Sequence, residues 1–331
     1  MVETIFRLAA DNLLSPIILF FALGLIAALA RSDLSIPEAA AKMLSIYLLF
    51  AIGFKGGVGV SAHGLDTTLV LSLIVGAILS FALPFLAFVL LRVMSRLSTV
   101  DAAAVAGHYG SISIVTFVAG TSVLESAGIA SEGYMVAVAA VMEAPAIFAA
   151  LWIAARHSTA EKNASRTQDT RGLLREILLN GSIVLLAGSF VIGFVTGAEG
   201  LAEIESFIIS PFKGVLCLFL LDMGLVAGRG LRNSAHELRP GLIGFGFLMP
   251  VLGSLAGLAG ASLIGLSTGG TVLLMTLSAS ASYIAVPAAM RVALPEANPS
   301  IYLTMSLGIT FPFNLVLGIP LYLSIAQFVG G

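Results

Sequence analysis

Long apolar runs with few charges are the feature that most constrains this sequence. A helix needs about 20 consecutive apolar residues to cross the hydrocarbon region of a bilayer. Because lipid offers backbone groups no hydrogen-bond partner, such runs are expected to be helical. The sequence therefore predicts an all-α integral membrane protein with ten transmembrane helices, at 13–30, 38–61, 67–92, 100–124, 133–155, 175–197, 207–228, 240–265, 268–291 and 300–328.

The composition agrees with this class. Of the 331 residues, 58% are hydrophobic and 10% are charged, whereas soluble domains are about 25% charged. A net charge of −2 gives no reason to expect a nucleic-acid partner. The single cysteine, Cys217, excludes an intrachain disulfide and is interpreted as a packing residue. The bilayer is the partner that this composition requires.

One long polar connection, 156–174, divides the chain into a first half, 1–155, and a second half, 175–331. Basic residues favour the cytoplasmic side of a membrane protein. If the connection is cytoplasmic, 13 of the 16 basic residues lie at the cytoplasmic ends of the helices, and only Arg7, Lys55 and Lys213 lie outside. The outer connections are instead acidic, with Glu125, Glu132, Glu199, Glu203 and Glu205. Both termini are therefore expected outside.

The two halves resemble each other. The stretch "LSTVDAAAVAGHYGSISIVTF" (97–117) can be placed on "LSTGGTVLLMTLSASASYIAV" (266–286) with a shift of 169 residues. Each half has five predicted helices, so the second copy enters the membrane upside down, as in many secondary transporters. Chance similarity between two apolar segments is the alternative.

Polar residues interrupt the fourth and ninth predicted helices at matching places. Pro287 removes a backbone donor and predicts a kink or break near Ser282–Val286. In the fourth helix, "GHYGSIS" (107–113) has two glycines in place of a proline. Two broken helices that cross at mid-membrane can direct positive helix ends at an anion, while carbonyls and hydroxyls bind sodium. Close packing of small residues is the alternative interpretation.

Buried charges are the other functional candidates, because each is costly at the bilayer centre. Glu143 lies mid-helix beside Pro145, and Asp222 lies in the middle of the seventh helix. Lys55 lies near the outer end of the second helix. For Lys55 and Asp222, a structural salt bridge between them is the alternative to a functional role. Asn314 follows a proline in the tenth helix. A carboxylate with amide and hydroxyl oxygens suits sodium.

The stretch "SASASYIAVPAAMRVALPEANPSIYLTMSLGITFPFNLVLGIPLY" (278–322) closely resembles the carboxy-terminal signature of the sodium-dependent bicarbonate transporter family. The runs at 219–232 and 98–113 resemble that family too. The resemblance implies ten helices in two inverted repeats, with discontinuous helices four and nine. It also implies a homotrimer, in which a core domain (helices three to five and eight to ten) moves against a gate domain made of the other four.

The resemblance also implies a site where the broken helices cross. The residues expected to bind the anion are Gly110, Ser111, Ser113, Thr116, Ser278, Ser280 and Ser282. Those expected to bind sodium are Glu143, Thr310 and Asn314. This sequence departs from the family pattern in three ways: the pattern has Asp where Glu143 stands, it has its lysine earlier than Lys55, and the central loop here is short. The short loop makes control by a PII-like regulatory protein doubtful.

The sequence thus predicts a symporter that takes up bicarbonate with sodium by alternating access, in the inner (plasma) membrane of a bacterium. No arginine lies at either predicted break, which favours a small, weakly charged anion. Sodium is the coupling ion expected, with no transition metal and no organic cofactor. The alternatives are a symporter of another small organic anion, a sodium–proton exchanger and a passive anion channel. An intramembrane enzyme is not expected, because Ser111 with His108 is the nearest approach to a catalytic pair.

Overall fold

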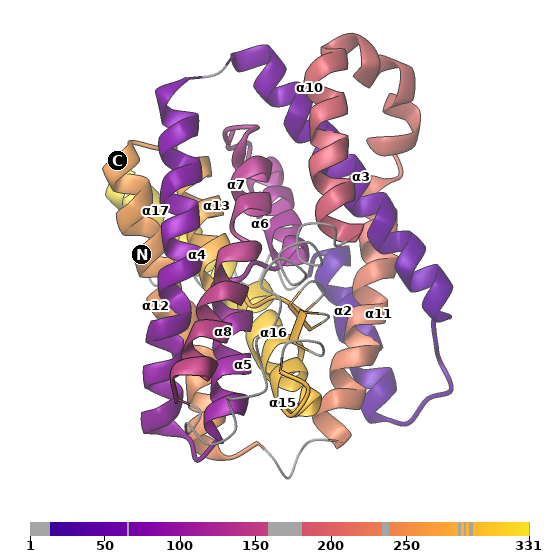
Figure 1. Cartoon of the computed structure of the whole chain (residues 1–331). Coiled ribbons are helices and arrows are strands. Elements are labelled where there is room, and N and C mark those ends of the chain that lie inside the picture. The colour runs from indigo at the N-terminus through magenta and orange to yellow at the C-terminus, as the bar shows by residue number, and fades with distance from the viewer. Residues whose placement is uncertain are drawn as a thin grey trace.

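The computed structural model describes residues 14–64, 66–157, 181–233, 238–283, 286–287, 289–290 and 294–330. All the regular elements in these ranges are helices (Figure 1). Eight of the described helices are long and apolar enough to cross a membrane, and two shorter apolar helices are Pro16–Leu29 and Thr268–Ala279. The prediction of an all-α integral membrane protein is confirmed.

Several predicted helices are single uninterrupted helices in the structure, among them α3 (Glu38–His63), α4 (Thr67–Met94) and α12 (Pro240–Ile264). Their starts follow local chemistry. Asp66 caps α4, because its carboxylate accepts a hydrogen bond from the Leu69 N–H at 2.7 Å. Pro240 occupies the first turn of α12, where no backbone donor is needed.

Four helices form one side of the molecule: α2 (Pro16–Leu29), α3, α10 (Gly181–Ile208) and α11 (Phe212–Asn233). Figure 1 shows them gathered at the right, with α2 beside α11 and α3 beside α10. Each pair joins a helix of the first half to one of the second half. We call these four helices the paired-helix group.

Glycines bring the backbones within each pair into direct contact. A Cβ atom on Gly24 of α2 would lie 2.1 Å from the Leu221 carbonyl oxygen of α11. A Cβ atom on Gly193 of α10 would likewise lie 2.1 Å from the Phe54 carbonyl oxygen of α3. Small residues at helix contacts are how membrane helices approach closely. The two pairs therefore depend on glycine at these positions.

We expect Gly193→Val to destabilise the protein by about 1–3 kcal/mol or more, because the added atoms meet backbone that cannot move aside. Gly188→Val in the same helix is the matched control, since no atom lies within 4 Å of a Cβ built there. Thermal unfolding of the purified protein measures both. Equal melting temperatures for the two variants would contradict the close packing of α3 on α10.

The remaining helices form the second group, which holds the broken elements. It contains α4, α12, α5 (Thr99–Gly110), α6 (Ile114–Ser126), α7 (Met135–Val141), α8 (Ala144–His157), α13 (Thr268–Ala279) and the last described segment, 299–330. Alanines of α5, among them Ala102, Ala103 and Ala104, have no exposed surface. We call this set the broken-helix group.

The sixth predicted helix differs from expectation. It was expected to end at 197 and to be followed by a loop, but α10 continues to Ile208. Gly197 kinks it with a φ of 59°, a left-handed conformation that glycine adopts without strain. Glu199, Glu203 and Glu205 lie on this helical extension. Their charges do not prevent a helix, because charged residues can be helical outside the apolar layer of the membrane. Residues 175–180 lie outside the described ranges.

Candidate functional site

The two predicted breaks have matching boundaries. Helices α5 and α13 each contain 12 residues. Their amino-terminal caps are Ser98 and Ser267, and their carboxy-terminal caps are Ser111 and Ser280. Each pair is separated by the 169 residues of the sequence alignment. The similarity between the halves therefore corresponds to the same local structure, placed twice.

The second break begins slightly earlier than predicted. It was expected near Ser282–Val286, and α13 already ends at Ala279. Pro287 does not terminate α13, because α13 has already ended and the backbone at 286–287 is helical. In the fourth predicted helix, α5 ends at Gly110 and α6 starts at Ile114.

The two breaks bond directly to each other. The Ser113 N–H donates to the Ser280 hydroxyl at 2.9 Å. The Ser282 N–H donates to the His108 carbonyl at 2.7 Å. All four residues are buried, with at most 4% of each exposed. Backbone groups freed by one break are thus satisfied by the other, which fixes how the unwound segments cross.

Not all the polar atoms at the crossing are satisfied. The Ser113 hydroxyl accepts from the Thr116 hydroxyl at 2.9 Å. In contrast, the hydroxyls of Ser111 and Ser278 are buried and have no hydrogen-bond partner among the described residues. A buried hydroxyl without a partner costs about 1–3 kcal/mol. The serines predicted from the sequence therefore lie at or next to the crossing, and two of their hydroxyls have no partner among the described residues.

A third break, which the sequence did not predict, places Glu143. Helix α7 ends at Val141 and α8 begins at Ala144, so that Glu143 lies in the turn between them. The Ser80 hydroxyl of α4 stabilises this turn, since it donates to the Met142 carbonyl and accepts from the Ala146 N–H at 3.2 Å. Pro145 was the only local signal, and the contact from α4 completes the break.

Glu143 faces a small buried cavity at the crossing. The cavity offers about 10 Å³ to a water-sized particle, and it is lined by Leu49, Ile112, Ser113, Ile114, Glu143, Ser282 and Tyr283. One carboxylate oxygen of Glu143, Oε2, is buried and has no hydrogen-bond partner among the described residues. Leu49 belongs to α3, so the cavity lies where the paired-helix group meets the broken-helix group. A space of this size holds one water or one small ion.

The structure does not bring Thr310 and Asn314 into this cavity. The Thr310 hydroxyl donates to the Gly246 carbonyl at 2.9 Å and contacts the Tyr109 hydroxyl at 2.6 Å. The Asn314 amide donates to the Ala279 carbonyl at 2.9 Å, at the end of α13. In this conformation both side chains form hydrogen bonds next to the breaks. Their binding of sodium stays a prediction.

Irregular backbone surrounds these two residues. The tenth predicted helix consists of α15 (Pro299–Leu303), a π-helical segment (Thr304–Thr310), α16 (Phe311–Phe313), a second π-helical segment (Asn314–Gly318) and α17 (Ile319–Gly330). π-Helical segments are rare and are often found at functional sites. The sequence predicted a continuous helix here.

Three other expected residues have different surroundings from those predicted. Gly110 allows close packing, because a Cβ there would lie 2.3 Å from the Pro84 ring of α4. Lys55 does not pair with Asp222, as its Nζ lies 3.8 Å from Glu125 Oε1 and 5.3 Å from the centre of the Phe212 ring. Asp222 is 6% exposed in α11 and lines none of the cavities described here. The structure therefore does not contain the Lys55–Asp222 salt bridge that was the alternative to a functional role for these two residues.

Helices broken where they cross, with unsatisfied hydroxyls and a carboxylate in the apolar interior, define a membrane transport protein. The chain belongs to the Na⁺-dependent bicarbonate transporter superfamily, whose family model matches residues 16–327. The match includes both halves, and it confirms the resemblance seen in the sequence. No individual curated protein matches the chain.

Proposed function

We propose that this protein is a symporter that couples the uptake of bicarbonate to sodium. The observation that carries the proposal is the crossing of the two breaks, where Ser113 and Ser280 bond to each other beside the Glu143 cavity. The superfamily supplies the substrate class. The location is the inner membrane of a bacterium, with both termini outside.

Sodium is assigned to the small cavity. Its lining carries the Glu143 carboxylate and the side chains of Ser113, Ser282 and Tyr283, which all end in oxygen. Oxygen ligands are those that hard cations prefer. A dehydrated sodium ion is no larger than a water molecule, whereas bicarbonate has four heavy atoms and exceeds this space. The unpartnered Glu143 oxygen supports a bound cation at this place.

Bicarbonate is assigned to the adjoining ends of the broken helices. The first turn of α6 begins inside the protein at Ile114, and a buried helix amino terminus favours an anion. The unsatisfied hydroxyls of Ser111 and Ser278 can donate to its oxygens. Hydroxyl and backbone donors without a buried arginine suit an anion with a single charge.

Alternating access follows in this proposal from the two groups of helices. Leu49 on α3 covers the cavity that Glu143 lines, so the paired-helix group acts as the gate and the broken-helix group as the core. Movement of the core past Leu49 would open the site first to one side and then to the other. We further propose that the two halves are inverted repeats and that the protein is a homotrimer.

Uptake of labelled inorganic carbon into proteoliposomes tests the function. An inward sodium gradient is expected to drive saturable uptake, and an equal potassium gradient is not. Uptake that is independent of sodium and does not saturate would indicate a passive channel instead. Sodium-driven uptake of a different small anion, without carbon uptake, would keep the mechanism and replace the substrate.

A further inference from the structure

A large cavity lies away from the crossing. It has a volume of about 390 Å³ and lies between α2 and α11 on one side and α6 and the last segment on the other. A second cavity, of about 260 Å³, lies between α3, α6 and α7. Lys213 and Ser122 line both cavities, so the two meet along α6 and the start of α11. We call the larger one the Lys213 cavity.

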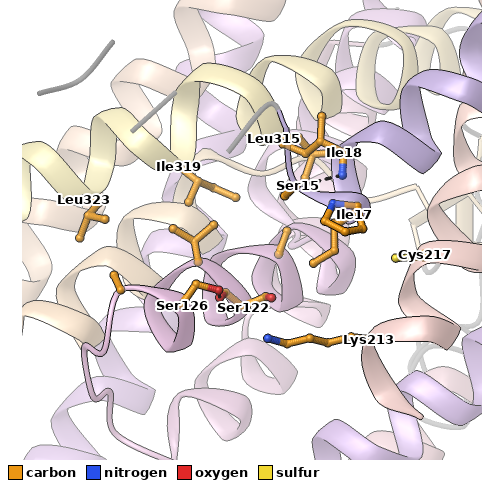
Figure 2. Close-up of a pocket in the computed structure, with 14 residues that line it drawn as sticks. Ser15, Ile17, Ile18, Ser122, Ser126, Lys213, Cys217, Leu315, Ile319 and Leu323 are labelled. Carbon is orange, nitrogen blue, oxygen red and sulfur yellow. Dashed lines mark hydrogen bonds between the residues drawn. The ribbon is translucent and has the colours of Figure 1, made fainter. Parts of the chain in front are cut away.

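Lys213 is the charged residue that lines the Lys213 cavity, whose other polar side chains are hydroxyls and a thiol. Figure 2 shows its side chain extending from α11 toward α6, on the side where Ser122 and Ser126 lie. The residue is exposed, and it makes no ion pair or hydrogen bond with any other described residue. The rest of the wall is mostly apolar, with Ile17, Leu315 and Ile319 among its residues.

The neighbouring charges are already engaged. Lys55 pairs with Glu125 at 3.8 Å. Both Glu132 oxygens bind Ser267, one its N–H at 2.8 Å and the other its hydroxyl at 2.9 Å. Lys213 is therefore the cation of this region that remains available. A single positive charge between apolar walls focuses its field into the cavity and raises the local concentration of anions.

One helix contributes to the walls of both the Lys213 cavity and the small Glu143 cavity. Helix α6 begins at Ile114, which lines the small Glu143 cavity, and reaches Ser122 in the wall of the Lys213 cavity. At 1.5 Å per residue, these residues are about 12 Å apart along the helix. Phe117 and Val118 line the second cavity between them.

We infer that the Lys213 cavity is a collecting site for a small oxyanion with one charge, held by the Lys213 ammonium and the Ser122 hydroxyl before it reaches the crossing. This inference rests on the proposed uptake of bicarbonate. Under the proposed orientation the cavity faces outside, so an anion enters it before the core moves. Lys213 then acts on binding of the substrate and not on the movement of the core.

A cysteine reporter tests the cavity without transport. Ser126 is exposed and lines the cavity, so Ser126→Cys in a Cys217→Ser background places one thiol there. Its rate of modification is measured in the purified full-length protein with methanethiosulfonates that carry a sulfonate or a trimethylammonium group. Lys213→Gln is expected to lower the ratio of the anionic to the cationic rate about fivefold at low salt, with less change at high salt.

Lys42→Gln is the matched control, since it removes the same charge from an exposed residue of α3 outside both cavities. It is expected to leave the ratio unchanged. Bicarbonate is expected to slow the anionic reagent, and chloride at equal ionic strength is not. An unchanged ratio in Lys213→Gln overturns the inference, as does equal protection by chloride.

Uptake gives the second readout. Lys213→Gln is expected to raise the bicarbonate concentration for half-maximal uptake about fivefold, with the maximal rate unchanged. A lowered maximal rate with unchanged half-saturation would contradict a collecting role. If the reporter responds to Lys213 but the protein takes up no carbon, the proposed function fails while the anion site stands.

Discussion

Glu143→Gln is expected to abolish sodium-driven uptake while leaving the protein folded. The carboxylate lines a buried cavity the size of one small ion, and its Oε2 atom has no partner among the described residues. Removing one partner of a buried ion pair costs about 3–5 kcal/mol, which corresponds to a loss of sodium affinity of about 100-fold or more. The amide keeps the shape of the side chain, so packing is preserved.

The measurement is uptake into proteoliposomes as a function of sodium concentration, with the melting temperature determined on the same preparation. Asp222→Asn is the matched control, because it also converts a buried carboxylate to an amide but lies outside the Glu143 cavity. It is expected to keep the sodium dependence of the original protein. Unchanged sodium dependence in Glu143→Gln would remove Glu143 from the site.

Substitution of the two unpartnered serines is expected to separate binding from stability. In Ser111→Ala/Ser278→Ala, two buried hydroxyls that bond to no described residue are removed. The melting temperature is therefore not expected to fall, because no hydrogen bond within the protein is lost. Hydrogen bonds to a charged group contribute about 1.5–3 kcal/mol each, so the affinity for bicarbonate is expected to fall about 100-fold or more.

Ser324→Ala is the control, and we expect it to affect stability and not bicarbonate affinity. Its hydroxyl donates to the Pro320 carbonyl at 3.0 Å and faces no described cavity. Its loss is expected to lower the melting temperature slightly and to leave the half-saturating bicarbonate concentration unchanged. If the double variant instead lost stability and kept its affinity, the two serines would be packing residues.

The positions of the two main breaks could be predicted because they are encoded locally. In an apolar run, glycine, serine and proline stand out, and their repetition after 169 residues marks the same feature twice. The structure places the caps Ser111 and Ser280 at these positions. The serines expected at the site are therefore where the sequence indicated.

Features that depend on contacts between distant helices could not be predicted. The break at Glu143 depends on Ser80 of α4, whose hydroxyl accepts from the N–H of Ala146, 66 residues further along the chain. The partner of Lys55 lies on α6, and a pattern along one helix does not identify it. Charges after Gly197 suggested a loop, yet the chain remains helical there, because charge alone opposes membrane burial and not helix formation.

The pairing of α2 with α11 and of α3 with α10 has a consequence for biosynthesis. The Gly24 surface of α2 is complete only when Leu221 arrives, and the Gly193 surface needs Phe54. A ribosome that has made only the first half has released α2 and α3 without either partner. Both helices then remain without their packing partners in the bilayer until the second half is inserted. The paired-helix group can thus form only after α11 has been made. A chain truncated at the central connection lacks α10 and α11 and cannot form this group.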